Sequence, residues 1–265
     1  MILLGKEIFV AILFGTIATA TAPAATVMVL KEYGIPGEFS ATLMVVLALD
    51  EFLALLIFSF MEPLSYILAS PELELTITNM LIVPFVRVVA AILLGLILGY
   101  ISQHLMVQCE SENRKILLIL ATIIGTTAAA VFLHISPLFA NLTVGFIYRN
   151  VPKRRLNISD KIDILTVPLL ATFFILAGTK IDISNLFNTN FLIIAFVYTL
   201  MRSLGKIGGA HMGAKLSSAP KHVENYIGFG LIPQIGITID LAFIIQKDFI
   251  HIPGNVANIS MLILN

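Results

Sequence analysis

The stretch SATLMVVLALDEFLALLIFSF, residues 40–60, is long enough to cross a lipid bilayer and carries charge only at its centre, at Asp50 and Glu51. A membrane-spanning α-helix needs about 20 predominantly apolar residues. A charged side chain at the middle of a bilayer costs about 2.5–3.5 kcal/mol on insertion scales, so acids at that depth usually serve a function. We therefore interpret this stretch as a membrane span that holds an ion or proton site.

The composition of the whole chain also indicates a membrane protein. Charged residues make up 12% of the 265 residues, about half the ~25% of soluble domains, and apolar residues make up 58%. The mean hydropathy is +0.98. The formal net charge is zero, so the charge balance does not indicate a nucleic-acid partner. We expect a protein whose main partner is the lipid bilayer.

Apolar stretches of about 20 residues predict an all-α integral membrane protein with about eight complete spans and a partial ninth. The complete spans are expected near residues 8–30, 40–60, 79–102, 115–133, 136–149, 163–180, 190–214 and 223–246, and the partial one at 254–265. Both ends of the chain are abrupt, which predicts that a single membrane transport domain, residues 1–265, is truncated at each end.

Lys and Arg are unevenly shared between alternate loops. One set of loops carries Lys31, Arg114, Lys115, Arg149, Lys153, Arg154, Arg155, Lys161, Lys215 and Lys221, and the opposite set carries Lys6, Lys180 and Lys247. Because cytoplasmic loops are enriched in these residues, we expect the loop at 31–39 to be cytoplasmic. The expected location is the plasma membrane.

Proline interrupts one span near each end of the chain. TATAPAAT, residues 19–26, contains Pro23, and LIPQIGITIDLAF, residues 231–243, contains Pro233. Proline frees backbone groups, which inside a membrane must line a cavity or meet protein. Broken spans in two corresponding regions are typical of inverted-repeat transporters, although Pro23 alone could be a simple kink.

Other charges lie within the spans that follow. Arg202 and Lys206 are four residues apart, so they share one face of a helix and can pair with an acid on a neighbouring helix. The alternative is that both cations snorkel to the membrane surface. Neighbouring residues of a helix point about 100° apart, so Asp50 and Glu51 are expected to have different partners.

Asp240 is a third acid within the membrane. It lies about two-thirds of the way outward along its span, which begins near Lys221 and ends near Lys247. An acid facing lipid is costly, so we expect Asp240 to line an outward-facing aqueous cavity rather than to bind the transported ion.

The ordered set of these segments resembles the monovalent cation:proton antiporter superfamily, in its sodium/hydrogen exchanger-like branch with two consecutive acids. TATAPAAT and then ALDEFLALLIFS are similar to the family's broken helix and acid-pair helix. SPLFANLTVGFIYRN, FFILAGTKIDI, the RSLGK helix and LIPQIGI are similar to later helices, in the same order. The resemblance covers nearly the whole chain and implies an inverted-repeat antiporter fold with two crossing proline-broken helices. Residues 8–102 would form the first broken helix and acid-pair region, and residues 190–265 the second broken helix and basic-helix region.

The resemblance also implies roles for single residues. Glu51 matches the family's ion-carrying and proton-carrying acid, and Asp50 matches the acid that pairs with a lysine, here Lys206. Thr21 matches a polar position before the helix-breaking proline. The family's second acid is commonly Asp, so the longer Glu51 leaves the choice between Na⁺ and K⁺ open. Asp240 stands where the family has a small or apolar residue.

These observations predict a secondary active antiporter, not an enzyme, that exchanges Na⁺ or K⁺ for protons by alternating access. The Glu51 carboxylate, the Thr21 hydroxyl and carbonyls near Ala22 would give the alkali cation the oxygen ligands it prefers. We expect no cofactor and no metal beyond the transported cation, and by resemblance a homodimer. The alternatives are a cation channel-like or regulated efflux protein, or a non-transporting fragment of an antiporter.

Overall fold

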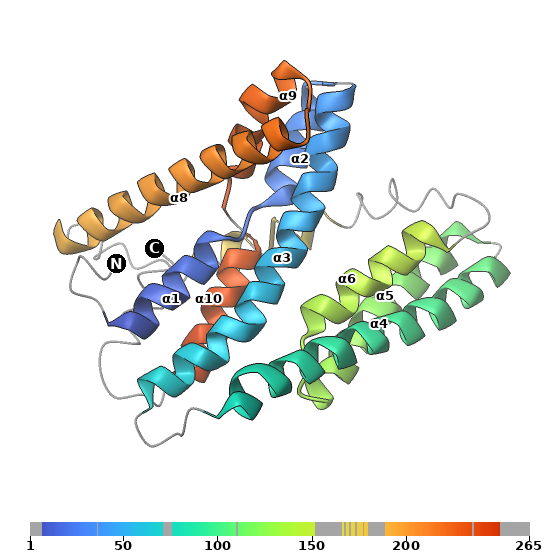
Figure 1. Ribbon diagram of the computed structural model, residues 1–265. Helices are drawn as coiled ribbons and strands as arrows, with labels where there is room; N and C mark the ends of the chain where they lie inside the picture. Colours follow the sequence, from blue (N-terminus) through green and yellow to red (C-terminus); the bar gives the residue numbers. More distant parts are fainter. Residues whose placement is uncertain are drawn as a thin grey trace. The chain divides into compact units, whose positions relative to one another are not determined.

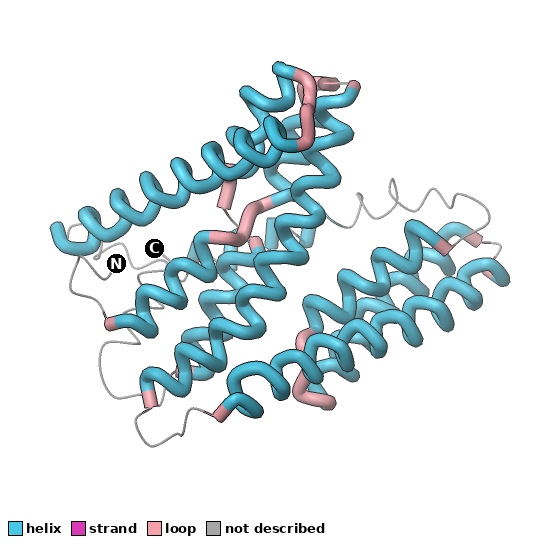
Figure 2. Tube along the Cα trace, viewed as in Figure 1, coloured by secondary structure: helices cyan, strands magenta, loops and turns pink. Residues whose placement is uncertain are grey.

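The computed structural model describes residues 7–35, 37–70, 76–109, 111–151, 189–234 and 236–249, with scattered positions between 166 and 179. In these residues every regular element is a helix and there is no strand (Figures 1 and 2). The chain forms two compact units. The first combines Met1–Leu75 with Lys180–Asn265, and the second is Thr76–Thr179. Residues 8–102 therefore contribute to both units.

The first unit contains two helices that are interrupted part-way. Its elements are α1 (Ile8–Ala18), α2 (Pro23–Glu32), α3 (Glu38–Ala69), α8 (Thr189–Leu216), α9 (Lys221–Tyr226), the 3-10 helix η4 (Ile227–Leu231) and α10 (Ile237–Asp248). The first interruption separates α1 from α2, where Pro23 is the first residue of α2 and its missing N–H leaves no donor unpaired. The second separates η4 from α10 and contains Pro233. It ends at Gly236, whose φ of +89° suits glycine.

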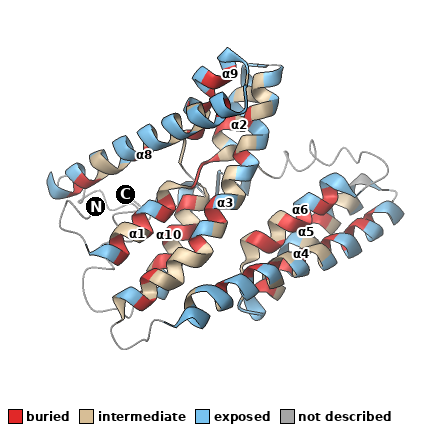
Figure 3. Ribbon diagram, in the orientation of Figure 1, coloured by how far each residue is buried: buried red, intermediate tan, exposed pale blue. Residues whose placement is uncertain are grey.

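Two long uninterrupted helices complete this unit. α3 packs against α1, and α8 packs against η4. Leu192, Phe196, Leu200 and Leu204 recur every four residues on α8 and are all exposed. Figure 3 shows that much of α8 is exposed. Apolar side chains exposed in this way suit contact with lipid.

Apolar side chains from four helices of the first unit pack into one buried cluster. This apolar cluster consists of Leu43, Leu47, Ala214, Val223, Ile227 and Leu231, from α3, α8, α9 and η4. Glycines let η4 approach its neighbours closely, because a Cβ placed on Gly228 would lie 2.7 Å from the Cα of Ile207. On α3 the cluster precedes Asp50.

The second unit is a bundle of three helices preceded by a short π-helix. Its elements are η2 (Thr78–Ile82), α4 (Val83–Gln108), α5 (Glu112–Phe132) and α6 (Pro137–Asn150). Gly95 and Gly99 of α4 lie directly against α6, as small residues allow in membrane helices. A hydroxyl cluster joins all three helices, since Ser102 Oγ lies 2.5 Å from both Thr122 Oγ1 and Tyr148 Oη.

Five helical stretches are long and apolar enough to cross a membrane, namely Ile8–Leu30, Glu38–Ala69, Thr78–Gln108, Asn113–Phe132 and Thr189–Leu216. They confirm the predicted all-α, multi-pass membrane class. The expected span at 136–149 corresponds to the 14 residues of α6, about 21 Å of helix, which is shorter than the ~30 Å hydrocarbon layer. The expected span at 223–246 is divided between α9, η4 and α10. The span expected at 163–180 lies in part outside the described residues, and the one expected at 254–265 lies wholly outside them.

Candidate functional site

The two interrupted helices meet at their interruptions and in the helical turns beside them. The Ala22 amide donates a hydrogen bond to the Pro233 carbonyl over 2.8 Å. The Thr26 hydroxyl donates to the Gly230 carbonyl over 2.9 Å, across 204 positions of sequence. Because helix ends carry unpaired N–H and C=O groups, this crossing brings backbone polar groups together within spans that are otherwise apolar.

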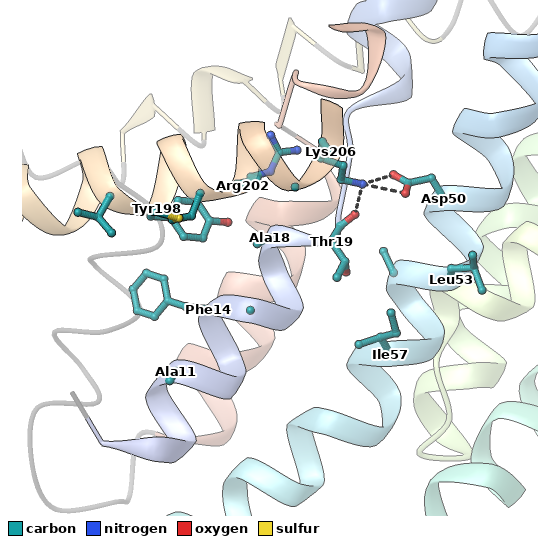
Figure 4. A pocket seen from close by; sticks show the side chains of 15 residues that line it. Ala11, Phe14, Ala18, Thr19, Asp50, Leu53, Ile57, Tyr198, Arg202 and Lys206 are labelled. Atoms are coloured by element: carbon teal, nitrogen blue, oxygen red, sulfur yellow. Dashed lines mark hydrogen bonds and ion pairs between the residues drawn. The ribbon is translucent and has the colours of Figure 1, made fainter. Parts of the chain in front are cut away.

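Lys206 of α8 binds both the crossing and an acid of α3. Its Nζ lies 2.6 Å and 2.8 Å from the two carboxylate oxygens of Asp50, and it donates to the Thr19 carbonyl at 2.6 Å (Figure 4). It also donates to the Thr21 hydroxyl at 2.9 Å, and that hydroxyl donates to Asp50. The side chains of Lys206 and Asp50 are only 11% and 23% exposed, so their ion pair is largely buried.

Arg202, one helical turn before Lys206, contacts both interruptions. Its guanidinium donates to the Ala20 carbonyl at 2.8 Å and to the Ile232 carbonyl at 2.5 Å. These carbonyls follow the C-terminal ends of α1 and η4, where the helix dipole places partial negative charge. Arg202 makes no ion pair with any residue that the structure describes. Its positive charge is met by backbone carbonyls rather than by a carboxylate.

Two further polar side chains belong to the site and were missed by the sequence analysis. Gln234, directly after Pro233, donates from Nε2 to the Ile17 carbonyl at 2.9 Å and to the Tyr198 hydroxyl at 2.8 Å. Two signals in the sequence point to them. Tyr198 precedes Arg202 by four residues and so shares its face of α8, and Gln234 is an amide within the apolar run LIPQIGI.

A cavity of about 720 Å³ adjoins the ion pair and lies between α1, α3 and α8 (Figure 4). Its wall is apolar apart from Thr19, Asp50, Tyr198, Arg202 and Lys206. The residues of α3 that line it are Asp50 and residues further along the helix, whereas the apolar cluster lies before Asp50. The carboxylate of Asp50 therefore lies between a cavity and a packed apolar region.

Glu51 and Asp240, the other two acids of the predicted site, do not line this cavity. Both are half-buried, Glu51 in the middle of α3 and Asp240 in the first turn of α10. Neither carboxylate forms a hydrogen bond or an ion pair with the part of the chain that the structure describes. The ~100° between neighbouring helix positions accounts for the different surroundings of Asp50 and Glu51.

Buried charges at the crossing of two interrupted helices, in a multi-pass membrane protein, are typical of transport proteins for ions. A family model described as "Sodium/hydrogen exchanger, transmembrane" matches residues 1–264. The chain belongs to this family, which confirms the resemblance seen in the sequence and assigns it to cation:proton exchange. No curated protein matches the chain.

Proposed function

We propose that this protein exchanges Na⁺, with K⁺ as the alternative cation, for protons by alternating access. The observation that supports this function best is the buried ion pair of Asp50 and Lys206 at the helix crossing. Glu51 is the next residue after Asp50 on α3. In this proposal the Glu51 carboxylate carries the cation in one half of the cycle and the proton in the other.

The different surroundings of the two acids support this division of roles. Asp50 is neutralised by Lys206 and also accepts a hydrogen bond from the Thr21 hydroxyl. Glu51 has no such partner among the described residues. A carboxylate held away from water binds a proton more readily, and a nearby cation favours its ionised form, so cation and proton compete for one acid.

The Lys206 ammonium already lies among oxygens of the kind that an alkali cation prefers. Its acceptors are the Asp50 carboxylate, the Thr21 hydroxyl and the Thr19 carbonyl, all within 2.9 Å of Nζ. A transported cation can bind these oxygens only after the Lys206 ammonium has moved away from them or lost its proton. By family resemblance, Asp50 would release a second proton as its pairing with Lys206 changes, and this would make the exchange electrogenic.

The cavity and the apolar cluster support alternating access. The cavity reaches Asp50 from the side of the α3 C-terminal half, while the apolar cluster fills the opposite side. With the loop at 31–39 in the cytoplasm, as the Lys and Arg distribution predicts, this cavity faces outward. By family resemblance we further propose a homodimer, and we propose the plasma membrane as its location.

Proton movement in sealed vesicles tests this function. The purified protein is reconstituted with a pH-sensitive dye inside, and NaCl, KCl, LiCl or choline chloride is added outside. We expect Na⁺ or K⁺ to drive protons across the membrane and choline to have no effect. Cation flux without any coupled proton movement would identify a channel instead.

A further inference from the structure

We propose that Tyr198 contacts the transported cation on the wall of the cavity, and that Gln234 is the positioning residue that holds its hydroxyl there. This inference rests on the proposed function and extends its site beyond the acids and Lys206. The transported species at this point would be a partly hydrated alkali cation on its way to or from the helix crossing.

The hydrogen bonds of Gln234 determine what the Tyr198 hydroxyl can do. An amide NH₂ group has two N–H donors, and Gln234 gives one to the Ile17 carbonyl and the other to the Tyr198 oxygen. Tyr198 therefore accepts this bond. Its oxygen keeps a second lone pair, and its own O–H remains available to water or a neighbouring group.

The aromatic ring of Tyr198 is fixed at its other side. It packs edge-to-face on Phe14 of α1, with ring centroids 5.7 Å apart and an interplanar angle of 70°. Figure 4 shows the ring reaching from α8 toward α1. A tyrosine held by packing along its ring and by a hydrogen bond at its hydroxyl has a defined position, as a ligand for a cation requires.

The position of Tyr198 in the cavity favours contact with a cation. It lies eight residues before Lys206 on the same face of α8, a rise of about 12 Å. Much of the rest of the cavity wall is apolar and includes Met201 of α8 and Leu53 and Ile57 of α3. A cation that loses water there needs oxygen ligands, and the Asp50 carboxylate is already paired with Lys206, so the neutral Tyr198 oxygen is an available contact.

Gln234 also connects this oxygen to the helix crossing. It follows Pro233, whose carbonyl accepts from Ala22, and its amide contacts Ile17 near the end of α1. A displacement of the second interruption therefore moves the Gln234 amide, which donates the hydrogen bond that the Tyr198 oxygen accepts. The cation-contacting oxygen would thus respond to the same movement that opens or closes the crossing.

The test measures the KM for Na⁺ and the maximal rate of proton exchange for Tyr198→Phe, Gln234→Leu and the double variant. We expect each single variant to raise KM about five-fold, as the loss of one neutral oxygen contact would, with a smaller change in maximal rate. The double variant should match the single variants, because Gln234 acts through Tyr198. Tyr148→Phe is the matched control, since it removes the same hydroxyl from the buried cluster of the second unit and should leave KM unchanged.

Thermal stabilisation by Na⁺ gives a second measurement that does not need transport. We expect Tyr198→Phe to require about five-fold more Na⁺ for the same stabilisation. Unchanged KM and unchanged Na⁺ stabilisation in Tyr198→Phe would overturn the inference, and additive effects in the double variant would overturn the role of Gln234. If the parent moves no protons but its Na⁺ stabilisation weakens in both variants, the proposed antiport fails and the Tyr198 contact stands.

Discussion

Replacing Lys206 by Met should destabilise the protein by about 3–5 kcal/mol, because it leaves the Asp50 carboxylate largely buried without its cation. The charges are close, with Nζ 2.6 Å from the nearer carboxylate oxygen. At an effective dielectric constant of ~20, this separation corresponds to an attraction of about 6 kcal/mol before the cost of desolvation is subtracted. After the substitution, the carboxylate retains the hydrogen bond from Thr21.

Asp50→Asn should also cost about 3–5 kcal/mol, because it leaves the Lys206 ammonium largely buried without its carboxylate. The ammonium keeps the Thr19 carbonyl and the Thr21 hydroxyl as acceptors, and the new amide oxygen can still accept from it. The variant with both substitutions should therefore lose about 2 kcal/mol less than the sum of the two single losses, a coupling within the range seen for contacting residues.

The assay is the free energy of unfolding of the four proteins in mixed detergent micelles, combined as a double-mutant cycle. The same cycle with Lys221→Met serves as the control, since Lys221 is 88% exposed and its ion pair is with Glu224 rather than Asp50. A coupling below about 0.5 kcal/mol between Asp50 and Lys206 would refute the reasoning, since additivity within that margin is expected of independent sites.

Two other predictions concern packing and access. Gly228→Ala should lower the free energy of unfolding by about 1–3 kcal/mol, because its Cβ would lie 2.7 Å from the backbone of Ile207. Gly125→Ala, which meets no atom of the described residues within 4 Å, should not, and equal losses in calorimetry would contradict this account. Cysteine at position 240, in a protein whose Cys109 is replaced by Ser, should react with a membrane-impermeant thiol reagent added outside. Labelling from the cytoplasmic side alone would place Asp240 in an inward-facing cavity.

The membrane class and the positions of five spans could be predicted from the sequence, because hydropathy over 20 residues reports the surroundings of a helix. The division into two units could not. An apolar stretch such as residues 79–102 is compatible with lipid and with any other helix, so it does not specify its partner. The close contact of Gly95 and Gly99 with α6 shows that the identity of the partner depends on the shape of both helices.

The candidate site shows the same limit at the level of single residues. The four-residue spacing of Arg202 and Lys206 predicted that both face one neighbour, and the structure places Lys206 against Asp50. The spacing could not distinguish a carboxylate from a freed carbonyl as partner, and Arg202 contacts carbonyls. The contact between Gln234 and Tyr198 was not predicted, because it joins α8 to the second interruption. The two residues are 36 positions apart, and no local sequence pattern indicates that they lie side by side.

The most direct test of the proposed mechanism is cation-driven proton movement by Glu51→Gln in reconstituted vesicles. Glutamine keeps the size of the side chain but can neither carry a proton nor offer a charged ligand, so exchange should be abolished at every Na⁺ and K⁺ concentration. Glu38→Gln, the same substitution at an exposed position in the first turn of α3, should exchange at the parent rate. Exchange at the parent rate in Glu51→Gln would contradict its assignment as the carrier of the cation and the proton.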